Sequence, residues 1–274
     1  PTDILIMPSD SDKHEEVKGL FPNAKRVMFK LSHNPRFQAL EEQGLCAGYD
    51  AILTSSQWLA DACKVPLEGW NHPSVEAKRV GWVNHGFKYF NVHPSLRKYN
   101  KLGQTPVVIC GLIHNHPLKG TDTFLQIGEI LSAKYGDQIQ LLAVGENMTV
   151  NRPKWLGYVH QPTRRQMLSI LAQADFWVGC SLSEGLGRMG LEAMGSGACC
   201  VLSNTGAEYV RDGKNALLFT PGYADQAVEC LDFLMADQVF RGKMAYAAWD
   251  TAKATSNPDP FMKAIDEALK EVLK

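Results

Sequence analysis

The sequence lacks the features that mark several large classes of protein. No apolar run in its 274 residues approaches the roughly 18 residues that a membrane-spanning helix needs. The 28 lysine and arginine residues are balanced by 29 aspartate and glutamate residues, so the net charge of -1 gives no basic excess for binding nucleic acid. The seven cysteines contain no C-x-x-C pair, which favours reduced, mostly buried thiols over a disulfide framework.

The beginning of the chain also lacks the basic segment and the long apolar stretch of a secretory signal. Together with the cysteine pattern, this predicts a cytoplasmic protein. Pro1 as the first residue fits either the removal of an initiator methionine or a trimmed fragment. What is present, 45% hydrophobic and 21% charged residues, is typical of a globular chain long enough for two domains with separate cores.

Short apolar runs alternate with longer amphipathic stretches along the chain. This alternation predicts an α/β fold with parallel sheets and right-handed crossovers. The expected strands are residues 3–7, 26–30, 51–54, 79–83, 107–110, 140–144, 176–179 and 199–202. The expected helices are residues 122–135, 164–174, 189–195, 224–237 and 260–274.

Residues 91–105 carry proline, glycine and charged residues without apolar periodicity, which is typical of a linker between domains. We therefore predict a first domain with its linker over residues 1–104 and a second domain over residues 105–250. The remaining residues, 251–274, end in an amphipathic helix. We expect Arg164 and Arg165, at the start of another predicted helix, to form a solvated face.

A glycine-rich turn separates a predicted strand from a predicted helix near residue 185. Gly185 and Gly187 let the backbone approach a ligand, and the free amides and dipole of the next helix form an anion site. A carboxylate beside a phosphate is repulsive, so we expect Glu184 and Glu192 to face hydroxyl groups, such as those of a sugar and a ribose. A generic glycine-rich turn with surface glutamates is the alternative at this point.

The segment EGLGRMGLEAMGSGACCVLSNTGAEYV resembles the E-x7-E signature of retaining GT-B glycosyltransferases, glycosyltransferase family 4, with Glu184 and Glu192 as its two glutamates. Glu208 and Asp212-Gly213 resemble the elements that follow it in that family. The resemblance implies two Rossmann-like domains with parallel sheets that face a cleft. It also implies sugar transfer from a nucleotide-diphosphate sugar to an acceptor, with retention of anomeric configuration and with no metal or other cofactor.

The resemblance also assigns roles to single residues. It implies that His33 contacts the donor sugar from the first domain, and that Glu184 binds hydroxyls of that sugar. Lys119, in the loop CGLIHNHPLKG, then neutralises the diphosphate. Glu192 then binds the ribose. The other donor-binding residues that it implies are Gly111, His116, Gly145, Leu156, Tyr158, Gly185, Leu186, Gly187, Arg188 and Met189.

Two departures from the family pattern bear on function. Leu112 stands where the family has an arginine of the diphosphate clamp, and His114, His116 or Arg188 can substitute for it. The first domain is shorter than is usual in the family, so it is a minimal acceptor domain, a fragment, or a part completed by a partner. The alternative function is therefore a nucleotide-binding, catalytically incomplete module that needs a partner subunit.

Other expectations are more limited. His114 and His116 lack a third ligand at useful spacing, so we predict no metal site. By resemblance the C-terminal helix crosses back to the first domain, and a partner or peripheral membrane contact is its alternative. No G-x-G-x-x-G motif follows an early strand, which argues against a dinucleotide-dependent oxidoreductase. The acceptor (glycan, lipid or protein), the base and the sugar are not predicted.

Overall fold

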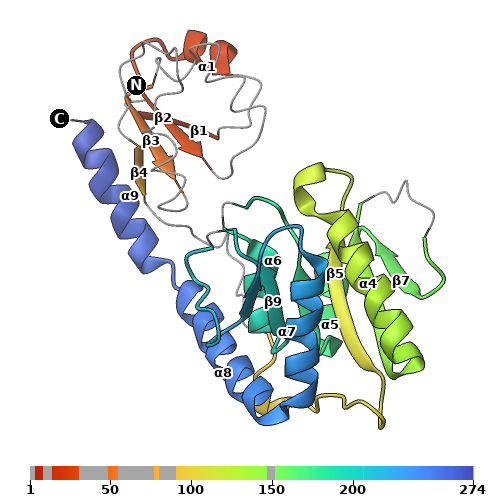
Figure 1. The fold of residues 1–274 in the computed structure, drawn as a ribbon. Helices are drawn as coiled ribbons and strands as arrows, with labels where there is room; N and C mark the ends of the chain where they lie inside the picture. Colours follow the sequence, from red (N-terminus) through yellow and green to blue (C-terminus); the bar gives the residue numbers. More distant parts are fainter. Residues whose placement is uncertain are drawn as a thin grey trace.

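The computed structural model describes residues 4–8, 14–30, 49–54, 77–79, 91–146, 152–184, 186–205 and 207–273 (Figure 1). Its first sheet has the strand order β1-β2-β3-β4, and all its strands are parallel. These strands are β1 (Ile4–Pro8), β2 (Lys25–Lys30), β3 (Ala51–Thr54) and β4 (Ala77–Arg79), and helix α1 (His14–Leu20) follows β1.

The second sheet has six parallel strands in the order β10-β9-β8-β5-β6-β7. Its members are β5 (Val107–Ile113), β6 (Ile139–Gly145), β7 (Leu156–His160), β8 (Phe176–Gly179), β9 (Cys199–Ser203) and β10 (Leu217–Phe219). Numbered within this unit, the order is 3-2-1-4-5-6, that of the doubly wound nucleotide-binding fold. The strand order reverses between β5 and β8.

Helices cover both faces of the second sheet (Figure 1). On one face α4 (Thr121–Tyr135) packs against β5 and β6, and beside it α7 (Ala224–Ala236) packs against β9 and β10, so that their apolar sides share one core. The opposite face packs against α5 (Arg164–Gln173), α6 (Arg188–Gly195) and α8 (Gln238–Thr255). Short 3-10 turns occur at Pro94–Leu96, Pro117–Lys119 and Gly136–Gln138. These two cores hold the ends of β5 and β8 in fixed positions.

The predicted linker is closely bonded to the second sheet and its helices. The backbone amide of Val92 donates to the Gly195 carbonyl at 3.2 Å, and the Tyr99 hydroxyl donates to the Gly197 carbonyl at 2.8 Å. The buried Asp175 carboxylate accepts from the amide and side chain of Asn100 at 2.8 and 2.9 Å. Residues 91–104 therefore run along the second unit, while the boundary near residue 104 stays a prediction.

The last helix, α9 (Asp259–Val272), contacts the first sheet although it follows α8 of the second unit. Its apolar residues Phe261, Ile265 and Leu269 pack against a cluster that includes Val27 and Leu53. None of the helices in the described part of the chain is both long and apolar enough to cross a membrane.

The α/β architecture with parallel sheets agrees with the prediction from sequence. The predicted strands at 51–54 and 176–179 have the same bounds in the structure, and those at 107–110 and 140–144 are extended at their ends. The sequence pattern did not predict α1, α8, β7 or β10. Of the predicted strand at 79–83, β4 includes residue 79, and residues 80–83 lie outside the described part.

Candidate active site

The candidate site lies where the strand order of the second sheet reverses. Residues 114–120 follow β5, and residues 180–187 follow β8, so both loops start from the carboxyl ends of neighbouring parallel strands. Ligands of doubly wound folds bind in the crevice at this position because neighbouring loops diverge there.

Gly120 allows the two loops to approach each other closely. Its φ is +66°, and a Cβ atom there would lie 1.9 Å from the carbonyl oxygen of Cys180. The Leu182 amide also donates to the Leu118 carbonyl at 2.8 Å. A glycine at this point therefore brings the residue before it, Lys119, to the loop that carries Glu184.

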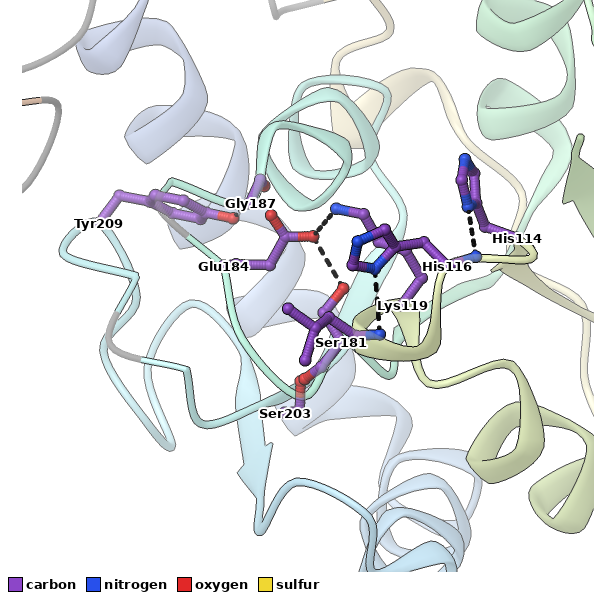
Figure 2. A network of polar contacts seen from close by, with 9 residues as sticks. His114, His116, Lys119, Ser181, Glu184, Gly187, Ser203 and Tyr209 are labelled. Atoms are coloured by element: carbon purple, nitrogen blue, oxygen red, sulfur yellow. Dashed lines mark hydrogen bonds and ion pairs between the residues drawn. The ribbon is translucent and has the colours of Figure 1, made fainter. Parts of the chain in front are cut away.

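Lys119 and Glu184 form an ion pair, with 2.6 Å between Nζ and Oε1 (Figure 2). Their side chains are 31% and 22% exposed, so the pair is partly shielded from water. The Ser181 hydroxyl donates to the same Oε1 atom at 2.8 Å, and the Ser203 hydroxyl donates to the Ser181 carbonyl at 2.5 Å. The structure thus brings together two residues that the sequence analysis selected and adds two serines that it did not.

Two histidines lie beside this pair (Figure 2). The Nδ1 atom of His114 accepts from the His116 amide at 2.9 Å, and Nδ1 of His116 accepts from the Leu118 amide at 3.2 Å. In the neutral ring the proton is then on Nε2. His114 Nε2 lies 3.5 Å from a Glu146 carboxylate oxygen, whereas His116 is exposed and can present Nε2–H to a ligand.

The N-terminus of α6 lies next to Glu184. Its N-cap is Gly187, with φ +74°, so no side chain caps the first amides of the helix. The Tyr209 hydroxyl donates to the Gly187 carbonyl at 2.7 Å and fixes this turn. Arg188 is exposed, while Leu186 and Met189 are half-buried. Uncapped amides and the helix dipole make this end suitable for an anion.

Glu192 lies further inside α6 and is 8% exposed. Its carboxylate is ion-paired with Arg164, the first residue of α5, whose start is fixed by a capping box at Thr163. The expectation that Arg164 belongs to a solvated face is therefore wrong, because its guanidinium neutralises a nearly buried carboxylate. The neighbouring Arg165 is exposed, as expected.

Four further predicted residues lie on β5, β6 and β7. A Cβ atom on Gly111 would lie 2.2 Å from the Phe124 ring, so this glycine serves the packing of α4 on the sheet. Leu156 is 3% exposed and belongs to the core. The Tyr158 hydroxyl donates to the Gly145 carbonyl at 3.0 Å. Donor contacts through these four residues stay predictions.

Two predicted residues, His33 and Gly185, lie outside the described residues. Among the residues that are described, no group of three or more His, Cys, Asp or Glu side chains is arranged to hold a metal ion. Sequence reasoning missed Ser181, Ser203, Arg164 and Tyr209. Only Ser181 carried a local signal, because it precedes Glu184 in the same short turn.

Comparison with known proteins gives a family for the second unit. Residues 104–237 match the model of the family described as "Glycosyl transferases group 1". A search among curated protein sequences gives no significant match.

Solved structures of other proteins align with nearly the whole chain. HepE from Anabaena, in complex with UDP-glucose, is 16% identical and has a TM-score of 0.68, with 93% of this chain and 74% of that chain covered. An α,α-trehalose-phosphate synthase (UDP-forming) from Burkholderia xenovorans, in complex with glucose-6-phosphate, is 13% identical and has a TM-score of 0.71, with 100% and 73% covered. For the sucrose-phosphate synthase from Thermosynechococcus elongatus the identity is 14%, the TM-score 0.68, and the covered shares are 94% and 70%.

At these identities the structural neighbours establish the fold, and the sequence match shows which family the part of the chain that carries the site is similar to. The chain has the GT-B fold of two Rossmann-like α/β domains, and its residues 104–237 match the family model of glycosyl transferases group 1.

Proposed function

We propose that the chain is a retaining glycosyltransferase of family 4 that moves a sugar from a nucleotide-diphosphate sugar to an acceptor. The observation that carries this proposal is the Lys119–Glu184 ion pair beside the N-terminus of α6, at the switch point of the second sheet. A cation, helix amides without a side-chain cap and a carboxylate close together match a diphosphate joined to a sugar. The UDP-glucose in HepE supports a nucleotide-sugar donor.

Lys119 and the amides at the start of α6 would neutralise the leaving diphosphate. Negative charge develops on that group as the glycosidic bond breaks, so preset donors there stabilise the transition state without a metal or other cofactor. Leu112, in place of the family's arginine, packs against the core on the α5–α6 side of the sheet. His116 and Arg188 are the donors that can replace that arginine.

The two glutamates would bind the neutral parts of the donor. Glu184 accepts from sugar hydroxyls, and Glu192, held by Arg164, accepts from those of the ribose. His33 would contact the sugar from the first domain as the domains close. Retention would follow from attack on the face that the diphosphate leaves, with the leaving phosphate taking the acceptor's proton, so no covalent nucleophile is needed.

We also propose a reducing compartment for the reaction. The described cysteines Cys110, Cys180, Cys199, Cys200 and Cys230 are all free thiols, which supports a reducing compartment such as the cytoplasm. There the chain would act in glycan biosynthesis, on a glycan, lipid or protein acceptor.

Thermal unfolding with UDP, GDP, ADP and CDP tests the donor site. A nucleotide at 100 times its dissociation constant stabilises a fold by about 2.7 kcal/mol. That corresponds to a rise in Tm of roughly 5 to 10 °C for a domain of this size. We expect one nucleotide to give the rise, Glu192→Ala to abolish it, and Glu229→Ala, at an exposed glutamate of α7, to keep it. No rise with any nucleotide would overturn the proposal.

The alternative is a module that binds nucleotide without transferring sugar until a partner completes it. The observation that favours it is Leu112, because the core side chain cannot contribute the charge of the missing arginine. Release of nucleoside diphosphate from UDP-glucose, GDP-mannose and ADP-glucose separates the two. Release by the purified chain supports the transferase, and nucleotide binding without any release supports the module.

A further inference from the structure

We propose that Ser181 is a positioning residue that holds the Glu184 carboxylate in place for the donor sugar, and that Ser203 fixes Ser181 from the sheet. The inference rests on the proposed function and extends it to residues outside the family signature. It follows from two observations. Ser203, Ser181 and Glu184 are linked in that order by hydrogen bonds, and Ser181 and Lys119 both contact the same oxygen of the Glu184 carboxylate.

The chain of contacts begins in a buried strand. Ser203 is the last residue of β9 and is 6% exposed. Its hydroxyl donates to the backbone carbonyl of Ser181 at 2.5 Å, and the Ser181 hydroxyl donates to Oε1 of Glu184 at 2.8 Å (Figure 2). Each contact fixes the next group, so the position of the carboxylate is set by the sheet rather than by the loop alone.

Both donors to Glu184 occupy the same oxygen. Lys119 and Ser181 reach Oε1, and among the described residues no group donates to Oε2. A carboxylate accepts through both oxygens, so Oε2 is available for sugar hydroxyls. The two donors therefore orient the carboxylate as well as hold it.

The two hydrogen-bonding groups, Lys119 and Ser181, behave differently once a sugar nucleotide is present. Lys119 carries its charge on a flexible stem and is 31% exposed, so a diphosphate can compete for it. Ser181 is neutral, short and fixed through its own backbone, so it keeps its contact with Glu184. Its contribution is consequently largest in the complex with the whole sugar nucleotide and smallest with the nucleoside diphosphate alone.

The test measures release of nucleoside diphosphate from the most active of UDP-glucose, GDP-mannose and ADP-glucose. We expect Ser181→Ala to lower kcat by roughly ten- to a hundredfold, the effect of losing one hydrogen bond to a charged group. Binding of the nucleoside diphosphate, measured by calorimetry, should change by less than about twofold because that ligand has no sugar. Ser181→Thr retains a hydroxyl and should restore most of the lost rate.

Two further variants make the design specific. Ser183→Ala removes a neighbouring hydroxyl that makes no hydrogen bond to any other described residue, and it should keep the wild-type rate. Ser203→Ala should lower kcat by several-fold, and combining it with Ser181→Ala should add little, since Ser203 acts only through Ser181.

The outcomes separate this inference from the proposed function. If wild type releases nothing from any sugar nucleotide, the proposed function fails and the inference fails with it. If wild type is active and Ser181→Ala is equally active, only the inference is overturned. A Ser181→Ala variant that loses nucleoside diphosphate binding and rate together would also overturn it, because that result indicates a collapsed loop rather than a misaligned carboxylate.

Discussion

Substitution of Gly120 by alanine should displace one of the two loops of the candidate site, because the added Cβ atom collides with the other loop at Cys180. The added Cβ would lie 1.9 Å from the Cys180 carbonyl oxygen, where real Cβ atoms keep at least 3.0 Å. One of the two loops must therefore retreat by roughly 1 Å, an overpacking that typically costs about 1–3 kcal/mol. The left-handed backbone at φ +66° adds about 1–2 kcal/mol for any residue with a Cβ.

Gly103 supplies a matched control. Its φ is +77°, and a Cβ there meets nothing within 4 Å, so Gly103→Ala carries the backbone cost without the collision. With roughly 2–4 °C in Tm for each kcal/mol, we expect Gly120→Ala to melt about 2–12 °C below Gly103→Ala.

The same substitution should impair activity because Lys119 precedes Gly120 directly. A misplacement of about 1 Å in a reacting group can cost roughly a hundredfold in rate, whereas Gly103→Ala should leave the rate unchanged. Thermal unfolding and nucleoside diphosphate release from a sugar nucleotide measure the two effects. Equal Tm values and equal rates for the two variants would refute this account of the loop.

Three other predictions concern buried charges and thiols. Arg164→Ala should cost more stability than Glu192→Gln, by about 1–2 kcal/mol in urea unfolding, because it leaves a nearly buried carboxylate without its cation; equal costs would contradict this. Asp175→Asn should cost about 2–3 kcal/mol in the same assay, since a buried amide cannot accept all the bonds of the carboxylate, and an unchanged midpoint would contradict it. Burial raises the pKa of Cys110 and of Cys199 to about 12 from 9.0, so the unfolded chain loses these protons first and stability should fall between about pH 9 and pH 12. Urea midpoints across that range test the last prediction. Alanine at both positions should reduce the slope without abolishing it, because burial also raises the pKa of Cys180, Cys200 and Cys230.

The strong apolar strands could be predicted from sequence because each is buried on both faces. The strand at 176–179, for example, is flanked by helices on both sides and has the same bounds as expected. Edge strand β7 is buried only at Leu156, and edge strand β10 has only three residues, so both lack this signal. Helix α8 was missed because its buried side is made of small residues such as Ala245 and Ala248.

The candidate site, like the fold, could be predicted from sequence only in part. Glu184 and Lys119 could be selected because each belongs to a recognisable motif, and the parallel topology then brings their loops together. The pairing of Arg164 with Glu192 depends on how the starts of α5 and α6 meet in space, which no local pattern in the sequence records. Polar contacts between elements are set by tertiary packing, so they become visible only in the structure.

The most direct test of the central claim exchanges the two charges of the ion pair. The double variant Lys119→Glu/Glu184→Lys restores an ion pair but reverses its ends, so a purely structural bridge would be rebuilt while a donor site would not. Calorimetric titration with the nucleoside diphosphate that stabilises wild type gives the readout. We expect the exchanged variant to melt within a few degrees of wild type. Its Kd for the nucleoside diphosphate should be higher by roughly a hundredfold or more. Binding equal to that of wild type would contradict the assignment of Lys119 to the diphosphate of the donor.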